Sequence, residues 1–60
     1  MSDEEVVNAA EILWAIEHND DKVSLRLISE DGTNYVFCYQ DGDVFETVCY
    51  TKEEIQIYYL

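Results

Sequence analysis

The chain has 60 residues, of which 48% are hydrophobic and 13% aromatic, with two glycines and no proline. This composition is typical of one small folded domain, spanning residues 1–60, and excludes a disordered acidic tail. Fourteen Asp and Glu residues against three Lys and Arg give a formal net charge of −11, which argues against direct binding to nucleic acid or to a membrane surface and favours a basic protein partner.

The first element is predicted to be a helix that begins at Asp3 and ends near His18. Ser2 and Glu5 form a capping box, in which each side chain accepts a hydrogen bond from the backbone N–H of the other residue. Apolar residues then recur with the 3.6-residue period of a helix: Val6, Ala9, Ala10, Leu13 and Ile16. The acidic opening lacks the positive charge of a signal peptide, and no apolar run could span a membrane, so we expect a cytoplasmic protein.

Three strands are predicted to follow as an antiparallel meander, because apolar and polar residues alternate along each of them. They are expected at residues 22–28, near 33–40 and near 43–50. Asp31-Gly32 and Asp41-Gly42 suit two-residue turns of type I′, whose positive φ angles glycine accepts. The predicted fold class is therefore α+β, with an N-terminal helix packed on a three-stranded antiparallel sheet.

Two-residue turns also fix which residues face each other across the strands. One sheet face, which the helix should cover, then collects Val23, Leu25, Leu27, Val36, Cys38, Phe45 and Cys49. The opposite face collects Tyr35, Phe37, Tyr39, Val44, Val48 and Tyr50, joined by Arg26 and Glu46. That second face is too apolar to be exposed only to water. Four of its aromatic side chains are candidate anchors for a partner: Tyr35, Phe37, Tyr39 and Tyr50.

Residues 51–60 carry two competing patterns. Thr51 and Glu54 form a second capping box, which indicates a short helix, whereas Ile55, Ile57 and Tyr59 alternate as they would in a strand. The segment is therefore either a short C-terminal helix or a fourth strand, and the capping box favours the helix.

The meander topology also predicts where carboxylates gather. The second turn and the entry to the first strand lie at the same end of the sheet, where four side chains should converge: Asp20, Asp21, Asp41 and Asp43. A second group should gather at the other end: Glu30, Asp31, Glu53 and Glu54. Such a rim is either only solvated or is recognised by a basic protein. A metal site is the weakest interpretation, because the spacing does not match a calcium-binding loop.

No catalytic motif is present. Cys38 and Cys49 lack the spacing of a zinc site, and the predicted register separates them by about 13 Å along a strand, too far for a disulfide. His18 is the single histidine and lies at the end of a helix, where the dipole favours positive charge. Without a phosphate-binding loop or an activated nucleophile, we expect neither an enzyme nor a cofactor.

The sequence DGTNYV at residues 31–36 belongs to a hairpin in a small acidic helix-then-meander domain. Over residues 3–50 this architecture resembles anti-CRISPR proteins, phage-encoded inhibitors that occupy the DNA-binding groove of a Cas9-type nuclease. Size and charge are also similar to those of short phage inhibitors of uracil-DNA glycosylase. The resemblance implies a non-catalytic nucleic-acid mimic that acts in the host cytosol on a DNA- or RNA-binding protein. The alternative is a homodimeric or adaptor module that uses the aromatic sheet face.

Overall fold

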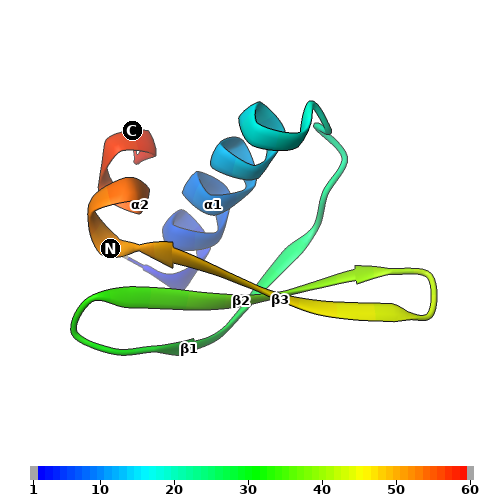
Figure 1. The fold of residues 1–60 in the computed structure, drawn as a ribbon. Coiled ribbons are helices and arrows are strands. Elements are labelled where there is room, and N and C mark those ends of the chain that lie inside the picture. The colour runs from blue at the N-terminus through cyan, green and yellow to red at the C-terminus, as the bar shows by residue number, and fades with distance from the viewer. Residues whose placement is uncertain (1, 60) are drawn as a thin grey trace.

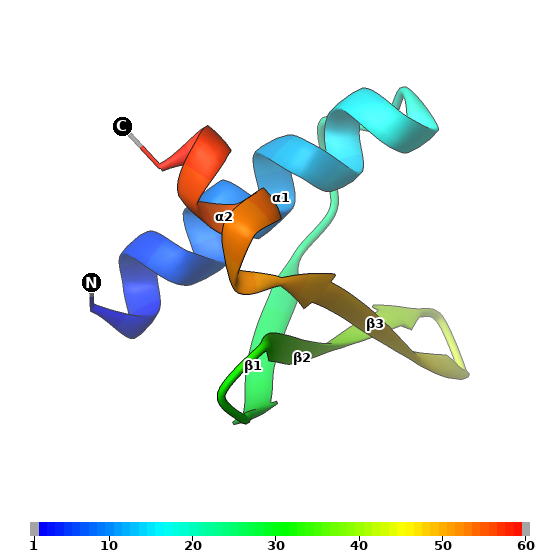
Figure 2. The ribbon, with the colours of Figure 1, turned by 60° about the vertical axis from the view of Figure 1, so that its left-hand side comes forward.

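The computed structural model describes residues 2–59. Its elements, in chain order, are α1 (Asp3–His18), β1 (Leu25–Glu30), β2 (Asn34–Asp41), β3 (Val44–Thr51) and α2 (Lys52–Tyr58). The strands form one antiparallel sheet in the order β1-β2-β3, and both helices lie on one face of it (Figure 1 and Figure 2). The predicted α+β class is confirmed, and the C-terminal segment is a helix and not a fourth strand.

Helix α1 begins and ends where the sequence predicts. The Ser2 hydroxyl accepts a hydrogen bond from the Glu5 backbone N–H, and the Glu5 carboxylate accepts one from the Ser2 N–H, each at 3.3 Å. Asn19 ends the helix in the left-handed conformation, with φ 52°, which asparagine tolerates. The buried side of α1 comprises Val6, Ala9, Ala10, Leu13 and Trp14. Ile16, expected on that side, is instead 61% exposed.

Helix α2 follows β3 directly because Thr51 caps it. The Thr51 hydroxyl accepts a hydrogen bond from the Glu54 N–H, and the Glu54 carboxylate accepts one from the Thr51 N–H, each at 3.1 Å. Ile55 is fully buried, and α2 packs against α1 and β3. No helix within residues 2–59 has both the length and the apolar character needed to cross a membrane.

The turn between β2 and β3 has two residues, as predicted, but lies one position later in the chain. Asp41 faces Val44, so the loop is Gly42-Asp43. Gly42 has a φ of 62°, whereas Asp43 does not have a positive φ, which is the pattern of a type II′ turn and not of type I′. This shift moves the register by two residues, so the same residues of β2 and β3 still share a face.

The turn between β1 and β2 is longer than predicted. β1 ends at Glu30 and β2 begins at Asn34, and Gly32 does not have a positive φ. Instead, Asp31 Oδ1 accepts hydrogen bonds from the backbone N–H of Thr33 at 2.7 Å and of Asn34 at 2.8 Å. The aspartate side chain therefore organises this turn.

A bulge in β1 decides which sheet face is buried. Before the bulge Leu27 faces Phe37, and after it Ser29 faces Val36, so Ile28 is the additional residue. One additional residue inverts the alternation of a strand. The register predicted for the first half of β1 is therefore wrong, because a regular strand would have placed Leu27 on the same face as Val36.

The helices cover the aromatic face of the sheet, which the sequence analysis assigned to the open side. Phe37 is fully buried and Tyr50 is 5% exposed. The whole core comprises Val6, Ala9, Ala10, Leu13, Trp14, Leu25, Phe37, Tyr50 and Ile55. Aromatic side chains remove more apolar surface from water than the Val and Cys side chains of the other face. This difference gives the observed register its energetic advantage.

The uncovered side of the sheet, here called the outer face, is made of the alternate register positions. They are Arg26, Ser29, Val36, Cys38, Gln40, Phe45, Thr47 and Cys49. The prediction that this side forms the core is wrong: Val36 and Cys38 are half-buried, Cys49 is exposed and Phe45 is 65% exposed. Cys38 faces Thr47 and not Phe45, and both thiols are free.

Candidate functional site

The pKa of the Tyr39 hydroxyl responds to carboxylates from three segments of the chain. Burial raises the pKa of Tyr39, and the charges of Asp41, Asp20 and Glu46 raise it further. Glu46 faces Tyr39 across β2 and β3, and Asp20 arrives from the segment after α1. The structure therefore brings Asp20 and Asp41, two of the predicted site residues, to the same phenol.

The other two predicted residues at this end are placed differently. Asp43 is exposed in the β2–β3 turn, two residues after Asp41. Asp21 lines a hollow of about 380 Å³ with α1 residues that include Glu11 and Ile12. We define the acidic end as Asp20, Asp41, Asp43 and Glu46. Glu46 was not among the predicted site residues, because a turn at Asp41-Gly42 would have paired it with Phe37, whereas the observed register pairs it with Tyr39.

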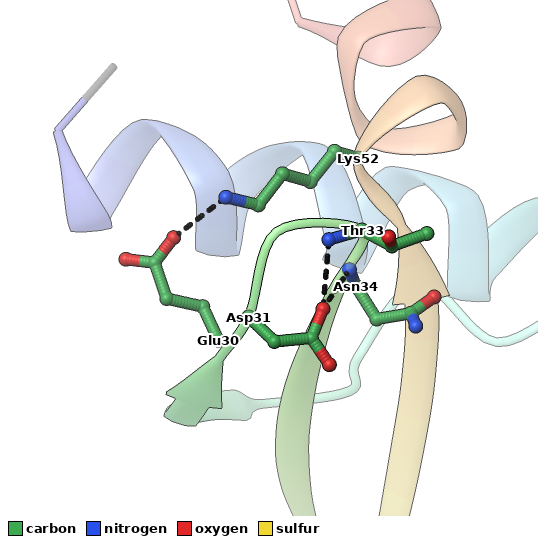
Figure 3. Close-up of polar contacts among 5 residues, drawn as sticks. All are labelled: Glu30, Asp31, Thr33, Asn34 and Lys52. Atoms are coloured by element: carbon green, nitrogen blue, oxygen red, sulfur yellow. Dashed lines mark hydrogen bonds and ion pairs between the residues drawn. The ribbon is translucent and has the colours of Figure 1, made fainter.

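Two of the carboxylates predicted at the opposite end of the sheet, those of Glu30 and Asp31, are engaged within the fold (Figure 3). Glu54 caps α2, and Glu53 is exposed. Lys52 Nζ lies 3.0 Å from Glu30 Oε2 and 5.0 Å from the centroid of the Tyr35 ring. The backbone hydrogen bonds from Thr33 and Asn34 lower the pKa of Asp31. The Glu30 carboxylate is therefore paired with the Lys52 ammonium group, and the Asp31 carboxylate accepts the hydrogen bonds that hold the turn.

The acidic end has no such compensation. Within residues 2–59, Lys52–Glu30 is the single salt bridge. Lys22 approaches Asp20 through its backbone, whose N–H donates to Asp20 Oδ1 at 3.0 Å. Asp41, Asp43 and Glu46 are all exposed, so their charge is directed to solvent. An arrangement of this kind attracts cationic groups from outside the molecule.

The four aromatic side chains predicted as anchors do not form an open surface. Phe37 and Tyr50 lie in the core, so the prediction that they meet a partner is wrong. Tyr35 and Tyr39 are half-buried, and Tyr39 stacks on Trp14 with 4.8 Å between ring centroids. The exposed aromatic residue of the sheet is Phe45, which the sequence analysis assigned to the core because nothing in the alternation of β1 indicated a bulge.

Within residues 2–59, no group of three or more His, Cys, Asp or Glu side chains is arranged to hold a metal ion. The His18 ring stacks on Trp14 with 3.8 Å between centroids, and its Nδ1 lies 3.2 Å from the Trp14 carbonyl oxygen. Comparison of the chain with protein-family models, curated proteins and solved structures found no match.

Proposed function

We propose that the protein is a non-catalytic inhibitor that binds a basic, nucleic-acid-binding protein and occupies the site that nucleic acid would use. Its net charge of −11 exceeds the magnitude of about 2 to 8 that keeps a small domain soluble. Such an excess destabilises a small fold through self-repulsion. Recognition of a basic partner gives this excess negative charge a function that offsets its cost in stability.

The acidic end is the proposed binding site, and one observation carries this choice. The carboxylates at the two ends of the sheet differ in compensation: Lys52 pairs with Glu30 at one end, whereas the charges of Asp20, Asp41 and Glu46 raise the pKa of Tyr39 at the other. Carboxylates that face solvent and have no cation beside them in the fold interact more favourably with the cationic groups of a partner than carboxylates that are already paired.

The geometry suits mimicry of a phosphate backbone in a simple way. Proteins that bind nucleic acid carry Lys and Arg arrays that neutralise phosphates spaced about 3.4 Å apart along each strand. Asp41 and Asp43 flank Gly42 at a tight turn, which holds both carboxylates on a defined backbone. Preplaced charges of this kind accelerate association and make binding sensitive to salt.

A competition experiment tests the proposal directly. The immobilised protein is incubated with a nuclease-treated cytoplasmic lysate at low salt, and bound proteins are eluted with a short DNA duplex or an RNA of matched length. We expect retained nucleic-acid-binding proteins to be released by the competitor. A purified Cas9-type nuclease, the target class that the resemblance implies, is tested in parallel. Retention that neither nucleic acid nor salt reverses would contradict the proposal.

Paired variants locate the site. Asp41→Asn combined with Asp43→Asn removes two charges from the acidic end, and we expect it to abolish most of the retention. Glu4→Gln combined with Glu53→Gln removes two exposed charges from the helix N-termini at the other end of the molecule (Figure 1) and serves as the matched control. Equal loss in the two double variants would show that only the total charge matters and that the acidic end is not a site.

A further inference from the structure

The outer face is free of carboxylates. Although 14 of the 60 residues are Asp or Glu, none occupies the eight outer-face positions defined above. The acidic residues within the strands, Glu30, Asp41 and Glu46, all occupy positions that alternate with the outer face. Arg26 contributes the single charge of the outer face, on the edge strand β1. This side of the molecule is therefore distinct from the surface proposed to bind a basic protein.

The outer face also offers an apolar projection beside a recess. Phe45 is 65% exposed, and the bulge residue Ile28 is 51% exposed. Arg26, Cys38 and Gln40 line a hollow of about 300 Å³ that has Phe45 at its border. A cavity of about 150 Å³ is enough to hold benzene. The hollow can therefore accept a phenyl ring presented by another molecule.

We propose that a second copy of this chain covers the outer face, with Phe45 of each copy seated in the hollow of the other. Phe45 and its neighbouring hollow satisfy the requirement of a two-fold interface that one patch be complementary to itself. Because this face has no carboxylates, two copies meet there without negative charges in contact, and Arg26 is the single charge that each copy brings. A partner attracted by the net charge would find no anionic group here.

The dimensions of the sheet limit the area that this dimer interface can bury, and therefore its affinity. Strands β2 and β3 have eight residues each, so the face measures about 26 Å by about 14 Å, a footprint of about 350 Å² on each copy. A standard interface buries about 800 Å² per partner. We therefore expect a weak, reversible dimer with a dissociation constant in the micromolar to millimolar range.

Salt distinguishes this interface from the proposed inhibitory site. Each copy carries a net charge of −11, so two copies repel each other at long range, and salt screens that repulsion. Dimerisation should strengthen as the salt concentration rises. Binding of a basic partner at the acidic end should weaken under the same change.

Sedimentation equilibrium across a range of protein and salt concentrations tests the dimer. We expect a monomer–dimer equilibrium that shifts toward dimer in high salt. Phe45→Ala should raise the dissociation constant of the dimer by about tenfold to a hundredfold, because it removes the phenyl ring that the interface buries. Thr47→Asp, which places a carboxylate on the outer face, should also produce a monomer. Ile57→Ala is the matched control, because Ile57 is 71% exposed on α2, and it should leave dimerisation unchanged.

Alkylation of Cys49 gives an independent measurement that needs no variant. Cys49 is exposed on the outer face, so its reaction rate with iodoacetamide should fall as the dimer forms. A monomer at every concentration and salt, a dimer that weakens with salt, or a dimer insensitive to Phe45→Ala would each overturn the inference. Phe45→Ala should retain the nucleic-acid-sensitive retention described above, and Asp41→Asn with Asp43→Asn should retain the dimer, so the two proposals fail separately.

Discussion

The hydroxyl of Tyr50 donates a hydrogen bond of 2.9 Å to Glu17 Oε1 and thereby joins β3 to α1. Burial, followed by this hydrogen bond and the charge of Glu17, raises the pKa of Tyr50, so the hydroxyl remains a donor at neutral pH. We expect Tyr50→Phe to lower the free energy of unfolding by about 1 kcal/mol, measured by urea denaturation. Tyr35→Phe is the control, because the Tyr35 hydroxyl makes no hydrogen bond within residues 2–59, and it should be close to neutral.

The register assigned to β2 can be tested with neighbouring residues on opposite faces. Phe37 is fully buried, so Phe37→Ala should cost about 3–5 kcal/mol, which approaches the total stability expected of a 60-residue domain. Val36 is half-buried on the outer face, so Val36→Ala should cost about 1 kcal/mol. Circular dichroism during urea unfolding measures both. If Val36→Ala were the more damaging change, the bulge at Ile28 would be wrongly placed.

The two glycines differ in backbone conformation, which gives a matched pair of substitutions. Gly42 has a φ of 62°, and alanine there should cost about 1–2 kcal/mol, because a Cβ clashes with the backbone in that conformation. Gly32 does not have a positive φ, and a Cβ there would meet no atom within 4 Å. Gly32→Ala should therefore change thermal stability by less than about 0.5 kcal/mol. Equal effects at the two sites would contradict the turn assignment.

The Asp31 turn should respond to pH in a defined direction. Backbone hydrogen bonds from Thr33 and Asn34 lower the pKa of Asp31. A carboxyl group whose pKa is lower in the folded state stabilises the fold above its unfolded value of about 3.9 and loses that contribution as pH falls through the folded value. We expect Asp31→Ala to lower the urea midpoint at neutral pH, with a difference from wild type that shrinks in acid.

Asp31→Asn provides the control for this titration, because its amide oxygen accepts the same backbone hydrogen bonds without carrying a charge. It should retain more stability than the alanine variant at neutral pH and should show a weaker dependence on pH. A difference between wild type and Asp31→Ala that stayed constant from neutral to strongly acidic solution would rule out a role for the ionised carboxylate in the turn.

Local signals explain which parts of the fold could be predicted. The two capping boxes involve residues three positions apart, so the starts of α1 and α2 could be read directly from Ser2 and Thr51. The Asp-Gly pairs located both hairpins, because turn residues act over short distances. The bulge at Ile28 could not be read in this way. It depends on which side chains the helices bury, and that preference is decided by packing across the whole domain.

The candidate site shows the same division. The approach of Asp20 to Asp41 follows from strand order alone, and the structure brings both to Tyr39. The choice between the two acidic ends required side-chain contacts, since the pairing of Lys52 with Glu30 joins residues far apart in sequence. The aromatic anchors were assigned to the wrong side of the sheet. The face of β2 that the helices cover was inferred from an uninterrupted alternation along β1, and the bulge at Ile28 interrupts that alternation.

The bulge at Ile28 is one unpaired residue between two regular halves of β1. Deleting this one codon would place Leu27 and Ser29 in succession opposite Phe37 and Val36, so both halves of the strand would keep their observed partners. Natural variation in this chain should therefore tolerate the loss of Ile28 far better than the loss of Arg26, which would move Leu25 from the covered face to the outer face.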